Sequence, residues 1–130
     1  MSGTAIKERF ERFLRAKGWP FVAVDEAARA LFGGVRPPRM FDFLVHAPDG
    51  PNLLCLLQPR PRATEADRKC LTEWRRIFGD GFDGCIVWTR RDQFRAATVT
   101  ELDRGAAIKD AAPIEELVDE TEALKLWGAA

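Results

Sequence analysis

The sequence has little of what catalytic triads and metal centres most often use. It contains one histidine and three cysteines among 130 residues. His46 has no Cys, Ser or second His at a recognisable spacing, and Cys55, Cys70 and Cys85 have neither metal-ligand spacing nor an even number. This argues against a histidine-based triad or a zinc centre. It predicts reduced thiols buried in the core of a cytoplasmic protein.

Long apolar runs and internal repeats are also lacking. No stretch approaches the length of a membrane-spanning helix, and the N-terminal segment MSGTAIKERF has no apolar core of the kind found in signal peptides. We therefore expect an intracellular protein with no membrane partner. A chain of 130 residues that is 46% apolar is long enough to bury the core of one domain.

The formal net charge is zero, but the charges are unevenly distributed. Residues 1–100 carry 17 Lys and Arg against 12 Asp and Glu, whereas residues 101–130 carry 3 against 8. This pattern divides the chain into an α/β domain over residues 1–100 and an acidic, helical C-terminal extension over residues 101–130, packed on or beside the domain. From about Pro113 the apolar residues suited to docking are Ile114, Leu117, Val118, Leu124, Leu126 and Trp127.

Residues 4–17 predict an amphipathic helix, with Thr4 as its N-cap and Gly18 as its stop. Its apolar stripe consists of Ile6, Phe10, Phe13 and Leu14. Glu11 borders the buried face of this helix, and its ordinary partner would be Lys7 at i−4.

A second amphipathic helix is predicted over residues 64–79. Thr64 and Asp67 approximate a capping box, and Gly79 ends the helix. The expected buried stripe consists of Cys70, Leu71, Trp74, Ile77 and Phe78. The other faces, with the residues just before the helix, form a modest basic ridge of Arg60, Arg62, Arg68, Lys69, Arg75 and Arg76. Such a ridge is either a solvated helix face or a surface that binds phosphates.

Apolar runs between these helices and after the second one predict strands. They cover residues 19–24, 41–46, 53–57 and 84–89, with a further edge strand at 96–100. Asp49-Gly50 predicts a hairpin between the second and third strands, and a short helix is expected before Gly33-Gly34. A hairpin is antiparallel and a helical crossover usually joins parallel strands, so we expect a mixed sheet of four to five strands flanked by helices, in the order α-β-β-β-α-β.

Asp42 is the unusual residue of the hairpin. It lies in a run, FDFLV, whose neighbours are apolar, and an unpaired charge is costly to bury. Arg36 and Arg39 approach this strand from the proline-rich segment VRPPR, and Arg90 and Arg91 follow the strand at 84–89.

At these residues the chain resembles the restriction-endonuclease-like PD-(D/E)xK superfamily, and more closely the small bacterial HYExAFE family. The resemblance covers about residues 5–90. It rests on Phe10-Glu11, on the segments FLRAKGWPFVAVDEAARALFG and FDFLVHAPDGPNLL, and on the W-x-x-x-F-G-x-G-F pattern from Trp74 to Phe82.

The resemblance implies nuclease chemistry at Glu11, Asp42 and an acid-x-Lys pair on the next strand. In such a site carboxylates hold Mg²⁺ against the scissile phosphate, and the lysine orients or polarises the attacking water. Here Leu56 and Gln58 stand where the acid and the lysine would be, and neither can replace them chemically. The family motif is also eroded, because Ala5, Ile6 and Lys7 replace its His, Tyr and first Glu.

Three functions follow as hypotheses. The first is a catalytically degenerate nuclease-fold protein, without a cofactor, that binds DNA or RNA or serves as a structural or partner subunit. It would do so through an Arg-rich surface made of residues 60–76 together with Arg36, Arg39, Arg90 and Arg91. The second is a Mg²⁺- or Mn²⁺-dependent endonuclease that binds metal through Asp42 and Glu11, its site rearranged with help from Glu65, Asp67 or Lys69. The third is an interaction module whose acidic tail, Trp127 above all, binds a protein partner or a second copy.

Overall fold

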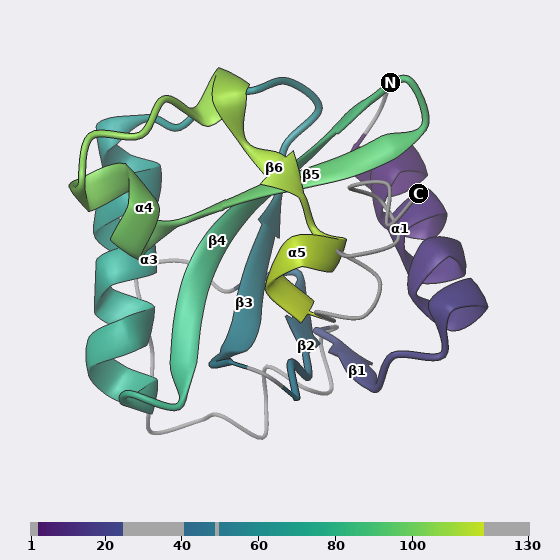
Figure 1. The fold of residues 1–130 in the computed structure, drawn as a ribbon, viewed down its shortest axis with the longest axis horizontal. Coiled ribbons are helices and arrows are strands. Elements are labelled where there is room, and N and C mark those ends of the chain that lie inside the picture. The colour runs from purple at the N-terminus through teal and green to yellow at the C-terminus, as the bar shows by residue number, and fades with distance from the viewer. Residues whose placement is uncertain (1–2, 25–40, 49, 119–130) are drawn as a thin grey trace, which may run out of the picture.

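The computed structural model describes residues 3–24, 41–48 and 50–118. A six-stranded sheet forms its centre (Figure 1). In the order in which they lie side by side, the strands are β1 (Phe21–Ala23), β2 (Phe43–Val45), β3 (Asn52–Leu57), β4 (Phe82–Arg90), β5 (Gln93–Thr98) and β6 (Ala112–Pro113). The helical elements are α1 (Gly3–Lys17), α3 (Glu65–Phe78), α4 (Val99–Asp103), the 3₁₀ helix η1 (Ile108–Asp110) and α5 (Glu115–Val118).

The sheet is mixed, as the sequence predicts. β3 and β4 are parallel and are connected through α3, whereas every other neighbouring pair is antiparallel. The expected order α-β-β-β-α-β is confirmed for α1 to β4. The expected number of four to five strands is too low, because the two-residue β6 is too short to leave a periodic pattern in the sequence.

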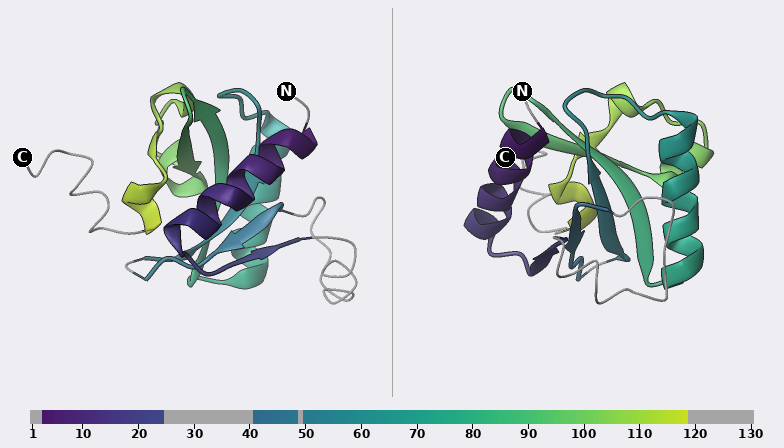
Figure 2. Two further views of the ribbon diagram at one scale, coloured as in Figure 1. Left: turned by 90° about the vertical axis from the view of Figure 1, so that its right-hand side faces the viewer. Right: turned by 180° about the vertical axis from the view of Figure 1, so that it is seen from behind.

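The sheet has a helix on each face, with α1 on one side and α3 on the other (Figure 2). Side chains of the strands alternate between these faces. Phe43, Cys55 and Val87 belong to the core that includes Phe10 of α1. Leu54, Leu56 and Ile86 belong to the core that includes Leu71 and Trp74 of α3. The central strands are buried on both faces, which explains their near-continuous apolar sequence.

Both ends of α3 agree with the ends predicted from the sequence, whereas the start of α1 differs from its prediction. Thr64 Oγ1 accepts a hydrogen bond from the Asp67 N–H at 3.1 Å, and Asp67 Oδ2 accepts one from the Thr64 N–H at 3.0 Å, which completes the predicted capping box. Gly79 ends α3 at φ +92°, a conformation that favours glycine. The predicted N-cap at Thr4 is wrong, because α1 already begins at Gly3.

β4 and β5 form a hairpin that was not predicted from the sequence. Arg90 pairs with Gln93, so only Arg91 and Asp92 form the loop, and both have positive φ, at 51° and 64°. Such a two-residue turn usually contains Asn-Gly or Asp-Gly, and this turn contains neither. The predicted strand at 96–100 therefore begins earlier, at Gln93, and it ends earlier, at Thr98, because Val99 and Thr100 begin α4. It is not an edge strand along its whole length, because β6 pairs with Arg95 and Ala96.

The chain after β5 packs back onto the α/β body. Ile114 and Val118 are buried against the α1 face, and Lys17 Nζ of α1 lies 3.6 Å from the Glu115 Oε2 atom. Of the expected docking residues, Ile114 and Val118 are buried in this core, and Leu117 is partly buried and packs against it. The other predicted features that lie outside the described residues are the short helix before Gly33-Gly34, Arg36, Arg39, Asp49, Leu124, Leu126 and Trp127.

The three cysteines are free and buried, as expected. Cys55 and Cys85 face each other across β3 and β4, with their Sγ atoms 3.5 Å apart. The contact with Cys55, together with burial, raises the pKa of the Cys85 thiol well above its ordinary value, so this thiol stays protonated. Within the described part of the chain, no helix is both long and apolar enough to cross a membrane.

Candidate functional site

Asp42 lies at the edge of the sheet where β3 ends. Its backbone extends the pairing of β2, since the Asp42 N–H donates to the Cys55 carbonyl at 2.8 Å and the Val24 N–H donates to the Asp42 carbonyl at 3.0 Å. Its side chain is only 10% exposed. Oδ1 lies 3.1 Å from the Lys7 Nζ atom, and Oδ2 accepts a hydrogen bond from the Leu57 N–H at 2.9 Å. Both oxygens of this carboxylate are therefore engaged by the protein itself.

The predicted pairing of Lys7 with Glu11 is wrong. Glu11 Oε1 instead lies 3.7 Å from the Arg15 Nη2 atom, one turn further along α1. The physical reason is the burial of Asp42, because a carboxylate shielded from water attracts an ammonium group more strongly than one on the helix surface. Among the described residues, no hydrogen bond or ion pair joins Glu11 to Asp42.

Leu56 and Gln58 lie on β3 and just after it. Leu56 is fully buried in the core under α3, so its side chain is part of the packing and is closed to solvent. The Gln58 N–H donates to the Val87 carbonyl at 2.8 Å, and its Nε2 donates to Asp67 Oδ2 at 3.4 Å. Gln58 is thus directed toward the start of α3, and Asp42 is paired with α1.

Glu65, Asp67 and Lys69, which could complete a rearranged metal site, all lie on α3 and make contacts within it. The Asp67 carboxylate caps the helix, as described above, and is buried. Glu65 and Lys69 form an exposed pair, with Oε1 and Nζ 3.9 Å apart. Over residues 3–24, 41–48 and 50–118, no three His, Cys, Asp or Glu side chains form a group that could hold a metal ion. Among the described residues, the side chains around Asp42 do not fit the Mg²⁺ site that the resemblance implies, since Mg²⁺ needs several oxygen ligands in octahedral geometry.

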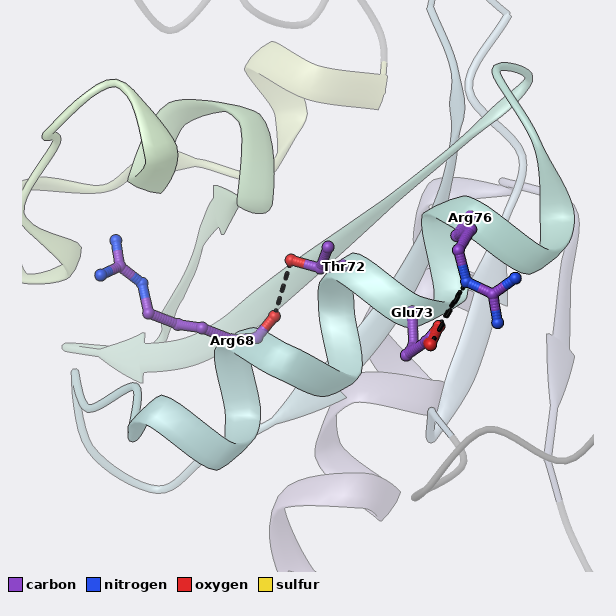
Figure 3. Close-up of polar contacts among 4 residues, drawn as sticks. All are labelled: Arg68, Thr72, Glu73 and Arg76. Atoms are coloured by element: carbon purple, nitrogen blue, oxygen red, sulfur yellow. Dashed lines mark hydrogen bonds and ion pairs between the residues drawn. The ribbon is translucent and has the colours of Figure 1, made fainter.

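The cations of α3 are largely engaged, and Figure 3 shows the contact between Arg76 and Glu73. Arg76 Nε donates to both carboxylate oxygens of Glu73, at 2.7 and 3.2 Å, and this hydrogen bonding lowers the pKa of Glu73. Arg68 Nη2 donates to the Leu102 carbonyl at 2.7 Å. Arg75 Nη1 donates to Thr100 Oγ1 at 3.1 Å. The side chains of the predicted ridge on α3 therefore contact α3 itself or the neighbouring α4.

Four arginines, two of them from the predicted ridge, are exposed at the carboxyl ends of β3 and β4. We call them the carboxyl-end arginines: Arg60, Arg62, Arg90 and Arg91. The first two follow β3, and the last two lie at the end of β4 and in its hairpin turn. In the described part of the chain, their side chains have no hydrogen bond or ion pair. Both segments reach the same end of the sheet (Figure 1).

These arginines and Asp42 lie at the same end of the sheet because β3 and β4 are parallel. Leu57, whose N–H binds Asp42, pairs with Val87, and β4 continues beyond Val87 to Arg90. The hairpin turn is also tied to α1, since Arg9 Nη2 lies 3.1 Å from the Asp92 Oδ1 atom. All of these arginines were named from the sequence, but only the parallel pairing places them at the same end of the sheet as Asp42.

His46 lies at the other end of β2. Its Nδ1 is 2.9 Å from Asn52 Oδ1, which also accepts a hydrogen bond from the Ala47 N–H at 3.0 Å. The contact stabilises the β2–β3 connection. A shallow hollow of about 170 Å³ lies beside it, lined by Pro20, Phe21, Val22, Leu44, His46 and Asn52. This largely apolar hollow offers no carboxylate or second histidine for catalysis.

No protein-family model matches the chain, and no curated protein does either. Among solved structures it is similar to Hjc, a Holliday junction resolvase from the archaeal hyperthermophile Archaeoglobus fulgidus. The TM-score is 0.55 at 18% sequence identity, over 75% of this chain and 78% of the resolvase. At this identity the likeness concerns the fold alone. Together with the mixed sheet and its flanking helices, it shows that the chain has the restriction-endonuclease-like fold.

Proposed function

We propose that this nuclease-fold protein binds nucleic acid through the carboxyl-end arginines and does not cleave it. The proposal keeps the resemblance to the HYExAFE family and treats the chain as a degenerate member of the PD-(D/E)xK superfamily. The observation that carries it is the contrast at one edge of the sheet. The Asp42 carboxylate is engaged by Lys7 and the Leu57 N–H, while the carboxyl-end arginines at the same end of the sheet are exposed.

Phosphate binding suits these arginines for a physical reason. A guanidinium group can donate two parallel hydrogen bonds to a phosphate, and an arginine without a protein partner gives up none when it does so. Arg68 and Arg76, in contrast, would have to break contacts of 2.7 Å with the Leu102 carbonyl and with Glu73. We therefore place the proposed phosphate-binding surface at the carboxyl ends of β3 and β4. It keeps Arg60 and Arg62 of the predicted ridge and leaves out the four ridge residues that lie on α3.

We expect no cleavage because of the residues at positions 56 and 58. Leu56 supplies no oxygen ligand, and Gln58 supplies no positive charge. Phosphoryl transfer depends on charge stabilisation of its transition state, so the loss of both groups should lower the rate by orders of magnitude. A nuclease with a rearranged site is the alternative. Its best support is the 3.4 Å contact between Asp67 and Gln58, which brings one further acid near β3.

The test is a fluorescence-anisotropy titration of labelled duplex, single strand and four-way junction at several KCl concentrations. Affinity should fall with salt, and each phosphate contact to duplex DNA contributes about 0.9 to the slope of log Kobs against log[KCl]. Changing the four carboxyl-end arginines to Gln should reduce the slope magnitude by roughly 2 to 4 if most of them contact phosphates.

The matched control changes Arg68, Lys69, Arg75 and Arg76 to Gln, which removes the same number of charges from α3. Circular dichroism establishes that both variants fold. A slope unchanged in the first variant and reduced in the control would place the phosphates on α3 and overturn the proposed surface. No salt-dependent binding of any of the three probes by the wild type would overturn nucleic-acid binding altogether.

A further inference from the structure

The buried Asp42 carboxylate needs a positively charged partner in the folded protein. Its side chain is about nine-tenths buried, and a carboxylate in such surroundings is costly unless it is paired and hydrogen-bonded. The pairing comes from a segment 35 positions earlier, where α1 extends Lys7 to within 3.1 Å of Oδ1. The hydrogen bond to Oδ2 comes from the Leu57 N–H, at the end of β3.

We propose that the Lys7 ammonium occupies the position beside Asp42 in which a divalent cation would have to bind, and makes the protein independent of such ions. A single ammonium charge matches a single carboxylate, whereas a divalent cation would need at least one more negative ligand here. Leu56 and Gln58 provide none, and Glu11 pairs with Arg15 instead. The inference concerns the cation site only and stands whether or not the chain binds nucleic acid.

The geometry also suggests that one substitution at Lys7 would turn this position into a binding site for a divalent cation. The Lys7 side chain is 49% exposed, so solvent reaches this edge and a metal ion could enter from it. Replacing Lys7 with Glu would remove the ammonium and place a second carboxylate opposite Asp42. Two carboxylates with room for water are the type of ligand set that Mg²⁺ and Mn²⁺ accept.

The experiment compares wild type, Asp42→Asn, Lys7→Met, Lys7→Glu and Lys7→Glu combined with Asp42→Asn. Arg15→Met serves as the control, because it removes an exposed ion pair from the same helix. Binding of Mn²⁺ is followed by electron paramagnetic resonance of the free ion, and the melting temperature is measured in EDTA and in Mn²⁺. Neither measurement requires any enzymatic activity.

The wild-type melting temperature should be the same in EDTA and in Mn²⁺, and Lys7→Met should melt lower than Arg15→Met. Lys7→Glu should bind Mn²⁺ at least about tenfold more tightly than the wild type, which corresponds to about 1.4 kcal/mol. The added Asp42→Asn change should abolish that gain. If Lys7→Glu folds only when Mn²⁺ is added, that result also supports the proposal.

Two results would overturn the inference. One is Mn²⁺ binding by the wild type as tight as by Lys7→Glu and lost on Asp42→Asn, since the ammonium would then not exclude the ion. The other is a Lys7→Met variant as stable as Arg15→Met, since Lys7 would then not compensate Asp42. A Lys7→Glu variant that folds in neither EDTA nor Mn²⁺, or that folds without binding Mn²⁺, would refute the conversion into a cation site.

Discussion

Introducing an acid at position 56 is expected to damage the core and leave the protein inactive. Leu56 has no exposed surface and packs with Leu54, Leu71 and Ile86 under α3. Losing a fully buried leucine side chain costs roughly 1.5 to 3 kcal/mol of unfolding free energy. The glutamate that replaces it must be protonated to stay buried, which at pH 7 costs roughly 3.7 kcal/mol from an ordinary pKa of about 4.3. The sum for Leu56→Glu, roughly 5 to 7 kcal/mol, is comparable with the whole stability of many domains.

The pH dependence separates this explanation from ordinary loss of packing. At pH 5 the protonation cost falls to roughly 1 kcal/mol, so Leu56→Glu should regain about 2.7 kcal/mol relative to the wild type. Urea unfolding followed by circular dichroism at both pH values measures the difference. Leu56→Met, which conserves volume, should lose less than about 1.5 kcal/mol at either pH. A Leu56→Glu variant as stable as Leu56→Met at pH 7, or one that gains Mn²⁺-dependent cleavage, would refute the reasoning.

Two further predictions concern the packing of β4. Gly84→Ala should destabilise the protein by roughly 1 to 3 kcal/mol in urea unfolding, because the added Cβ would lie 2.9 Å from the Leu71 Cδ2 atom and 3.1 Å from its Cα; a neutral effect would contradict the tight contact with α3. Burial raises the pKa of the Asp83 carboxyl above its ordinary value of 3.8, even though Thr100 donates a hydrogen bond to it and Arg75 is near. The folded state therefore binds the Asp83 proton more readily than the unfolded state. Stability from this group is present below the ordinary pKa and lost as the pH rises through the raised pKa, so Asp83→Asn should flatten the stability profile in that acidic window. Identical profiles for variant and wild type would count against it.

Local patterns predicted the elements that carry the fold. The stripe of α1 is buried at Ile6, Phe10 and Leu14, as its spacing indicated. The capping box at Thr64 likewise needed only neighbouring residues. The mixed sheet followed because a hairpin and a helical crossover fix strand direction with little help from distant contacts.

The candidate site was harder to predict because its contacts join distant segments. Helical spacing assigned Lys7 to Glu11, since nothing local indicates that the Asp42 carboxylate is buried within reach of α1. The engagement of Arg68 and Arg75 was equally hidden, because their acceptors belong to α4, a five-residue helix that the sequence did not predict. Asp42 and the carboxyl-end arginines lie at the same end of the sheet because β3 and β4 pair in parallel, which only the tertiary structure shows.

The central claim, binding without cleavage, can be tested in one titration. A labelled four-way junction and a labelled duplex are titrated with wild-type protein in Mn²⁺, and the same samples are then run on a denaturing gel. We predict a salt-sensitive rise in anisotropy with every strand intact. Strands cut by the wild type and left whole by the Asp42→Asn variant would contradict the claim and establish a metal-dependent nuclease.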